Sequence, residues 1–154
     1  MQKLLITLLA SLAVLVGLHP TEAKPPPSGG FASVVIGDTT IKLELARTPA
    51  EQTQGLSDRT SLDERAGMLF VFPADQIPAF WMKEMRFPID IIWLNVDGQI
   101  VDITPNLAPS TFPQTFSPKI PIRYVLEVNA GFAGRHDLKI GDFIHFSGVP
   151  GLQN

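Results

Sequence analysis

Residues 67–94 have the sequence GMLFVFPADQIPAFWMKEMRFPIDIIWL, and this stretch is the most informative part of the chain. It contains two apolar runs, at residues 67–72 and 79–83, and all but the last residue of a third, at residues 90–95, with prolines in the segments between them. Short apolar runs bounded by prolines are typical of β-strands. The third run is apolar on both faces, which predicts a central strand of a sheet.

Strand patterns also lie on both sides of this stretch. Residues 33–36 and 40–45 flank a Gly-Asp turn, and the second run alternates between apolar and charged side chains. This period-2 alternation predicts a hairpin with a half-buried strand. Residues 122–128 alternate again, with Arg123 and Glu127 expected to face solvent. Further strands are predicted at residues 99–104 and 143–146.

Only one segment is convincingly helical. Thr48 is a natural N-cap, Pro49 occupies the first helical position, and Glu51 completes a capping box. The helix is predicted at about residues 49–57. About eight short strands with one helix predict a mainly β, compact antiparallel sandwich or barrel, in preference to a βαβ arrangement. The proline-rich segment 104–121 is expected to form a long ordered loop or an edge excursion.

The N-terminus has the features of an export signal. Residues 4–18 form an almost wholly apolar run of about 15 residues, shorter than the roughly 20 that span a membrane. A Thr-Glu-Ala triplet ends at Ala23 and resembles a signal-peptidase site. Cleavage there predicts a periplasmic or secreted protein without stable membrane insertion, and an uncleaved anchor is the alternative. The predicted organisation is a signal peptide (1–23), a Pro/Gly linker (24–30), one β domain (31–149) and a tail (150–154).

The composition limits the possible chemistry. The 154-residue chain has no cysteine, which excludes disulfides, thiol nucleophiles and thiolate metal sites. Its formal net charge is -3 and no basic cluster occurs, so nucleic acid is not an expected partner. His136 and His145 lack the spacing of a zinc site. The mature chain's methionines at 68, 82 and 85 fit a core better than a copper site, so no metal or cofactor is expected.

Several motifs follow one another along the chain: GL…R (55–59), GMLFVF (67–72), FWMK (80–83), FPIDIIWL (87–94), DGQIVDI (97–103), YVLEVNAG (124–131) and IGD (140–142). In this order they resemble the DUF192 family, a domain of unknown function in bacteria and archaea that often follows a signal peptide. The similarity extends over about residues 34–146. It implies a jelly-roll-like β sandwich and no established activity. The chain departs from the usual family pattern at Ser57, Glu84 and Met85.

Trp81, Lys83 and Asp90 form the leading candidate site. On a strand, Trp81 and Lys83 share a face, and Asp90 opens the next strand, so Lys83 and Asp90 can meet across a hairpin. An aromatic platform beside a cation and a carboxylate suits a sugar or another small polar ligand. The alternative is that Trp81 belongs to the core and that Lys83 and Asp90 form a structural ion pair.

Arg59 is expected to border this groove from the loop after the helix. Its planar guanidinium can capture an anion, or it can form a salt bridge with Glu64 or Glu127 that pins the loop to the sheet.

The leading functional hypothesis is a non-enzymatic binding or accessory module of the cell envelope for a small polar or anionic ligand. One alternative is an envelope hydrolase of a glycan or ester, with paired carboxylates drawn from Asp90, Asp102 and Glu127. Another is a protein-interaction domain that uses the 104–121 loop. The sequence assigns no catalytic residue and leaves the oligomeric state open.

Overall fold

The computed structural model describes residues 30–149, so the predicted signal peptide, all but the last residue of the linker, and the tail lie outside it. Within the described part of the chain, no helix is long and apolar enough to cross a membrane. The elements, in chain order, are β1 (Phe31–Ile36), β2 (Thr39–Ala46), α1 (Pro49–Gln54), β3 (Ala66–Gln76), β4 (Phe80–Trp81), β5 (Ile89–Leu94), β6 (Ile100–Leu107), the 3-10 turn η1 (Pro109–Thr111), β7 (Thr115–Phe116), β8 (Ile122–Asn129), α2 (Phe132–Arg135) and β9 (Phe146–Ser147).

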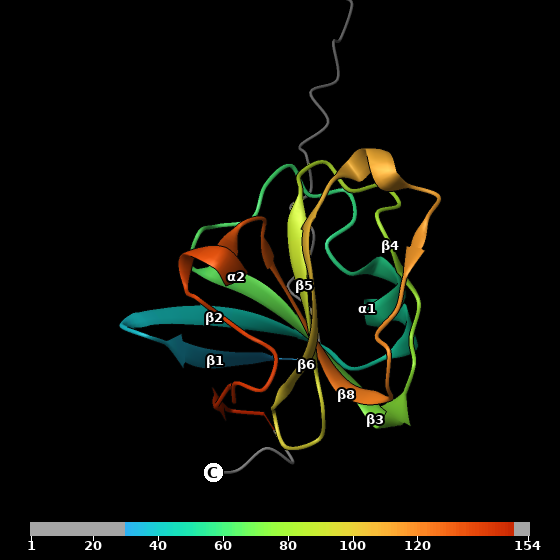
Figure 1. Ribbon diagram of the computed structural model, residues 1–154. Helices are drawn as coiled ribbons and strands as arrows, with labels where there is room; N and C mark the ends of the chain where they lie inside the picture. The colour runs from blue at the N-terminus through green and yellow to red at the C-terminus, as the bar shows by residue number, and fades with distance from the viewer. Residues whose placement is uncertain (1–29, 150–154) are drawn as a thin grey trace, which may run out of the picture.

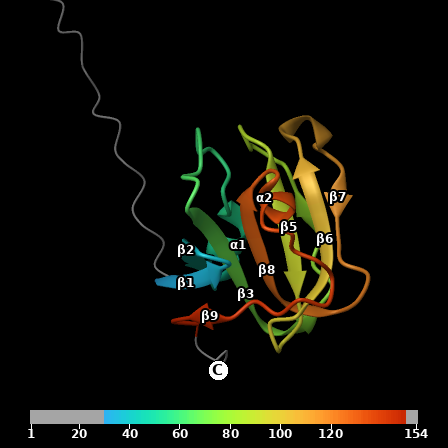
Figure 2. The ribbon, with the colours of Figure 1, turned by 60° about the vertical axis from the view of Figure 1, so that its left-hand side comes forward.

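Seven of the strands form one mixed sheet in the order β6-β5-β8-β3-β2-β1-β9, and β4 pairs separately with β7. Figure 2 shows the large sheet from β1 and β9 at one end to β6 at the other. The predicted mainly β, sandwich-like class is confirmed. In the described residues, however, β6 and β9 remain edge strands, so the sheet does not close into a barrel.

The β2–β3 pair corrects the expectation of a purely antiparallel sheet. These strands run parallel, in register from Lys42–Ala66 to Ala46–Phe70, and α1 lies in the connection between them. Parallel neighbours need a crossover connection, which is commonly helical. The chain therefore contains a βαβ arrangement, formed by β2, α1 and β3. The sequence favours an antiparallel arrangement instead, because only one segment has a helical pattern.

The predicted hairpin and helix start are confirmed. β1 pairs with β2 from Phe31–Glu44 to Ile36–Thr39, and residues 37–38 form the turn. The Thr48 side chain and Glu51 form a complete capping box at the start of α1. The helix ends at Gln54, earlier than predicted, because Gly55 takes a positive φ of 47°. That conformation suits glycine, and an added Cβ would also lie 3.2 Å from the Phe70 ring.

Two predicted strands have different bounds. β3 does not stop at Pro73 but continues to Gln76, with an irregularity in its pairing to β8 between Val71 and Gln76. Proline is tolerated at such an irregularity because no ladder hydrogen bond is lost there. β4 contains only residues 80–81, and it pairs with β7 rather than with β5.

The large sheet has an apolar core on each face, and α1 and β4 lie on one side of it with α2 on the other (Figure 1). β5 is buried along its whole length, as predicted for a central strand. Tyr124, Leu126 and Val128 of β8 belong to the core beneath α2, and Val125 belongs to the core beneath α1. By strand alternation, Glu127 faces the α1 side. Its 6% exposure shows that the predicted solvent-facing position is wrong.

Candidate functional site

A pocket of about 300 Å³ opens on the face of the sheet that α1 and β4 cover. α1 and the loop after it form one wall, β3 and β8 form the floor, and residues 78–85 form the other wall. Its lining residues are Pro49, Gln52, Thr53, Gln54, Gly55, Leu56, Ser57, Phe70, Phe72, Pro78, Ala79, Phe80, Trp81, Met85 and Glu127.

The α1 wall is fixed to the sheet by a glutamine. The Gln52 Nε2 group donates hydrogen bonds to the carbonyl oxygens of Ala46 (3.3 Å) and Val71 (3.0 Å). Those carbonyls belong to β2 and β3, so one side chain joins the helix to both strands of the parallel pair. A helix as short as α1 is marginal alone, and these bonds together with its capping box hold it in place.

The opposite wall depends on two aromatic residues with different roles. The Phe80 ring packs edge-on against Phe70 and Trp93, with centroid distances of 4.9 and 5.4 Å. Trp81 remains 52% exposed and meets Phe112 edge-on at 6.2 Å. Phe80 therefore anchors β4 to the core, and Trp81 stands at the rim of the pocket.

Glu127 is the ionisable group on the floor of the pocket. Burial raises the pKa of its carboxyl to about 8, although the positive charge of Arg59 lowers it somewhat. No donor among residues 30–149 forms a hydrogen bond with this carboxyl. Every described side-chain oxygen that is fully shielded from solvent has a partner, so the Glu127 oxygens must reach the pocket.

Arg59 pairs with a residue that the sequence did not suggest. Its guanidinium donates to both Glu44 oxygens, at 2.5 and 2.7 Å, in a bidentate ion pair. Glu44 lies on β2, so the predicted pinning of the post-helix loop to the sheet is confirmed. The expected partners Glu64 and Glu127 are wrong as salt-bridge partners. Glu44 also raises the pKa of Arg59, and this bond occupies much of the guanidinium.

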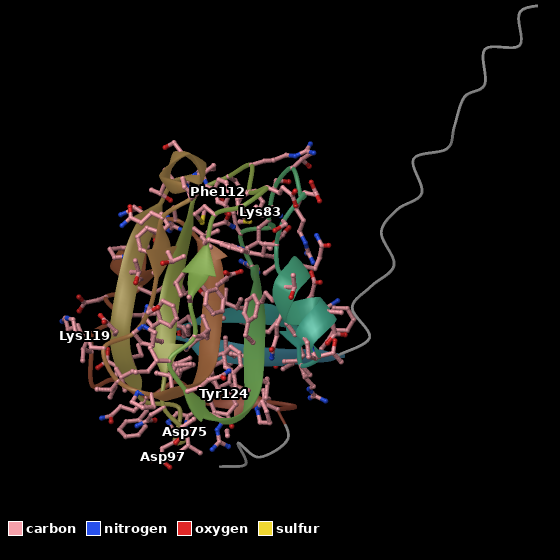
Figure 3. All side chains as sticks on the ribbon, turned by 90° about the vertical axis from the view of Figure 1, so that its right-hand side faces the viewer. Asp75, Lys83, Asp97, Phe112, Lys119 and Tyr124 are labelled. Carbon is pink, nitrogen blue, oxygen red and sulfur yellow. The ribbon has the colours of Figure 1, made fainter. Side chains whose placement is uncertain are left out.

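The structure brings Trp81 and Lys83 together, as expected. Both line a hollow that adjoins the pocket and shares Thr53 and Ser57 with it. The Lys83 carbonyl accepts a hydrogen bond from the Ser57 hydroxyl at 3.0 Å, while the Lys83 side chain is exposed. Figure 3 places Lys83 at the same end of the molecule as Phe112, away from Asp75 and Asp97.

Asp90 is not part of this group, and the expected Lys83–Asp90 contact is wrong. Its carboxylate is 0% exposed and accepts hydrogen bonds from the backbone N–H groups of Asn106, Gly131 and Ala133, at 2.8, 3.0 and 2.9 Å. The reason is topological: β4 and β5 belong to different sheets and form no hairpin. Asp90 instead fastens the start of α2 to β5.

The carboxylates considered for acid–base chemistry do not meet in the pocket. Glu127 is the one carboxyl among the lining residues, and Asp102 lies on β6 near Lys119, with 4.0 Å between Oδ2 and Nζ. Within the described residues, no group of three or more histidine, aspartate or glutamate side chains is arranged to hold a metal ion.

The sequence points to Glu127 as one of several possible acid–base carboxylates, but the half-buried pattern of β8 predicts the wrong side for it. A signal was present: Val125 shares a face with Glu127, while Tyr124, Leu126 and Val128 occupy the other face. Apolar residues on both faces indicate a central strand, and a carboxyl inside a central strand is buried. The sequence of α1 shows no comparable sign that its residues line a pocket.

The model of the DUF192 family, described as an uncharacterized ACR, matches residues 32–146. The chain belongs to the DUF192 family. The match covers the large sheet except for the first residue of β1 and the last residue of β9, and it includes every residue that lines the pocket. The description of the family gives no activity.

Two crystal structures are similar to this DUF192 domain. A protein of Sinorhizobium meliloti 1021, described as a candidate transcription regulator, is 30% identical with a TM-score of 0.70, over 77% of this chain and 94% of that one. A protein of unknown function from Novosphingobium aromaticivorans DSM 12444 is 34% identical with a TM-score of 0.69, over 79% and 90%. No curated protein matches the chain.

Proposed function

We propose that this DUF192 domain is a non-enzymatic binding module whose small polar ligand enters the pocket between α1 and β4. One observation carries the proposal: a single cavity combines aromatic lining residues with a buried carboxyl, Glu127, that has no hydrogen-bond partner among the described residues. Small-molecule sites are mostly apolar hollows in which a few polar groups fix the orientation of the ligand. The volume lies at the lower end of their usual range of about 300–1,000 Å³.

The charges around the pocket narrow the expected ligand. An anion at the floor would be repelled by Glu127 whenever that carboxyl is ionised, and it would find no free cation there because Arg59 is already bound to Glu44. Lys83 lies at the mouth, but Glu84 lines the same hollow and offsets its charge. These positions favour a neutral polar or cationic ligand over the anionic one that the sequence also allowed.

The proposed place of action is the cell envelope, in the periplasm or outside the cell. The support is the apolar run at residues 4–18 and the small-residue site ending at Ala23. Measuring the mass of the mature N-terminus after expression tests this proposal. A mature chain that begins at Lys24 supports it, and an intact Met1 in a cytosolic fraction contradicts it.

Two-dimensional NMR with a panel of small polar fragments tests the binding role. Fragments that bind should shift the Trp81 indole N–H resonance and leave that of Trp93 unchanged, because Trp93 is buried and donates to Thr104 at 2.9 Å. Thr53→Trp, on an exposed lining position of α1, should fill the mouth and abolish the shifts. Thr40→Trp, on the exposed side of β2, is the matched control. Shifts that survive Thr53→Trp would place the ligand elsewhere.

The raised pKa of Glu127 supports a hydrolase as a second candidate. A carboxyl with a pKa of about 8 is protonated at neutral pH and has the state required of a general acid. The pocket supplies no second carboxylate among its lining residues. Hydrolysis of nitrophenyl esters or glycosides that disappears in Glu127→Gln would support the hydrolase over the binding module.

A further inference from the structure

We infer that the ligand of this pocket is a small organic cation, with an apolar body against the aromatic residues of the floor and of the β4 wall and an N–H-bearing ammonium group on the Glu127 carboxylate. The inference rests on the proposed function and names the chemical class of ligand. A pocket of this kind prefers cations to neutral polar molecules.

The first support is the missing donor at Glu127. Asp90 is as deeply buried, and three backbone N–H groups satisfy it. Glu127 is 6% exposed, and no described donor satisfies it. An ionised carboxylate only accepts hydrogen bonds, and burying it without donors is costly. A primary ammonium brings three N–H donors and a compensating charge.

The second support is the charge of the surrounding elements. Arg59, from the loop after α1, is the cation that acts on Glu127, and its guanidinium is held by Glu44 of β2. Glu51 of α1 lies beside Arg59 around a neighbouring hollow. With Glu127 ionised, two carboxylates, Glu44 and Glu127, act on the one guanidinium of Arg59. The local field therefore favours a positive ligand and disfavours an anion.

The third support is the aromatic lining. Phe70 and Phe72 contribute to the floor of the pocket, and Phe80 and Trp81 contribute to the β4 wall. Aromatic ring faces attract cations, and they contribute most where the cation is desolvated. A cavity of about 300 Å³ also has room for an organic body and not only for a bare ammonium ion.

The raised pKa of Glu127 adds a measurable consequence. At neutral pH the empty pocket holds a protonated carboxyl, because burial disfavours the charged form. The other charged groups near it are Arg59 of the post-helix loop, Glu44 of β2 and Glu51 of α1. A bound ammonium favours the ionised form, so binding near neutral pH should release up to one proton.

Three probes that share a phenyl ring test the inference: 2-phenylethylammonium, 2-phenylethanol and phenylacetate. Calorimetric titrations of the purified protein should give an affinity for the ammonium at least about tenfold above that for the alcohol, with phenylacetate the weakest. Titrations in buffers of different ionisation enthalpy should show proton release with the ammonium alone. Equal affinities, or tighter binding of the alcohol or phenylacetate, would overturn the inference and leave the pocket as a binding site. If none of the probes shifts the Trp81 resonance, the inference and the proposed function both fail.

Glu127→Gln separates charge recognition from the shape of the pocket. This variant should bind 2-phenylethylammonium about as weakly as 2-phenylethanol, bind the alcohol as wild type does, and release no proton. Glu64→Gln, at an exposed position outside the pocket lining, is the matched control and should keep the wild-type preference. An ammonium preference that persists in Glu127→Gln would contradict the assignment of Glu127.

Discussion

At the scale of single residues, two buried carboxyl groups differ in their hydrogen bonding. Asp90 accepts three backbone hydrogen bonds and ties β5 to the start of α2. Glu127, on the neighbouring strand β8, receives none from the described residues and faces a pocket. A satisfied buried carboxylate stabilises its fold, whereas an unsatisfied one destabilises it when it ionises. Asp90 is therefore structural. Ionised Glu127 destabilises the fold, and a ligand that supplies hydrogen-bond donors can offset this loss of stability.

Glu127 should make the folded domain less stable as the pH rises. Its folded pKa of about 8 lies above its ordinary value of 4.5, so the native state keeps a proton that the unfolded chain loses. The contribution to stability is therefore fully present below about pH 4.5 and is lost as the pH rises through about 8, with a slope of at most about 1.4 kcal/mol per pH unit. In urea unfolding, the advantage of Glu127→Gln over wild type should grow between about pH 5 and about pH 8.5. An advantage that does not change with pH contradicts the raised pKa.

Asp90→Asn should destabilise the domain by about 2–4 kcal/mol at neutral pH. The amide oxygen can replace one carboxylate oxygen, but the amide NH₂ group then faces a backbone N–H that needs an acceptor. Thermal or urea unfolding measures this loss. Lys83→Ala is the contrasting variant, because its exposed side chain forms no ion pair in the described residues, and it should change stability by less than about 0.5 kcal/mol. A large loss in Lys83→Ala would restore the structural pair that the sequence suggested.

At the scale of elements, local patterns such as turns and helix caps were predictable from the sequence, but the pairing of strands was not. The turn at residues 37–38 and the capping box of Thr48 each depend on residues only a few positions apart in the chain, and both are confirmed. The β2–β3 pairing and the separation of β4 from β5 depend on contacts between distant segments. Side-chain alternation shows that a strand is buried, but it does not show which strand lies beside it. The expected Lys83–Asp90 contact failed for this reason.

The Arg59–Glu44 ion pair, which joins the post-helix loop to β2, should contribute to the stability of the domain. The two side chains are 22% and 19% exposed, so solvent screens them less than a surface pair. Arg59→Ala should cost about 2–3 kcal/mol, and a double-mutant cycle with Glu44→Ala should give a coupling of about 1–2 kcal/mol. Arg59→Ala should also raise the pKa of Glu127 further, because it removes the positive charge that lowers it. Strictly additive losses would show that the pair contributes nothing beyond its separate contacts.

At the scale of the whole molecule, the sequence predicted the class and the family but not the pocket. The mainly β fold and the DUF192 motifs were visible in the apolar runs of residues 67–94. The pocket joins residues 49–57, residues 78–85 and Glu127, which are far apart in the chain. Of the predicted site residues, Trp81 lines the pocket, Lys83 lies at its mouth and Arg59 lies beside it. Such a site becomes visible only when the order of the strands is known.

The backbone amides around the pocket should fall into a slowly exchanging group and a rapidly exchanging group. β8 forms long ladders with both β3 and β5, whereas β4 is joined to β7 over only two residue pairs. The amides of β8 should therefore exchange only when the whole domain opens, and those of β4 and β7 should exchange through local opening. Mass spectrometry of exchanged peptides measures both rates. Equal protection in the two regions would contradict the division.

The short β4–β7 ladder has a consequence for how a ligand comes and goes. The wall that carries Trp81 can separate from the floor without breaking a hydrogen bond of the seven-stranded sheet. Entry and exit then need a local motion that unpacks Phe80 and the buried Met82, which is a smaller barrier than global unfolding. Ordering this wall around a ligand also reduces its conformational entropy, which offsets part of the binding free energy. The expected behaviour is rapid exchange and moderate affinity, which suits a protein that samples its surroundings better than one that stores its ligand.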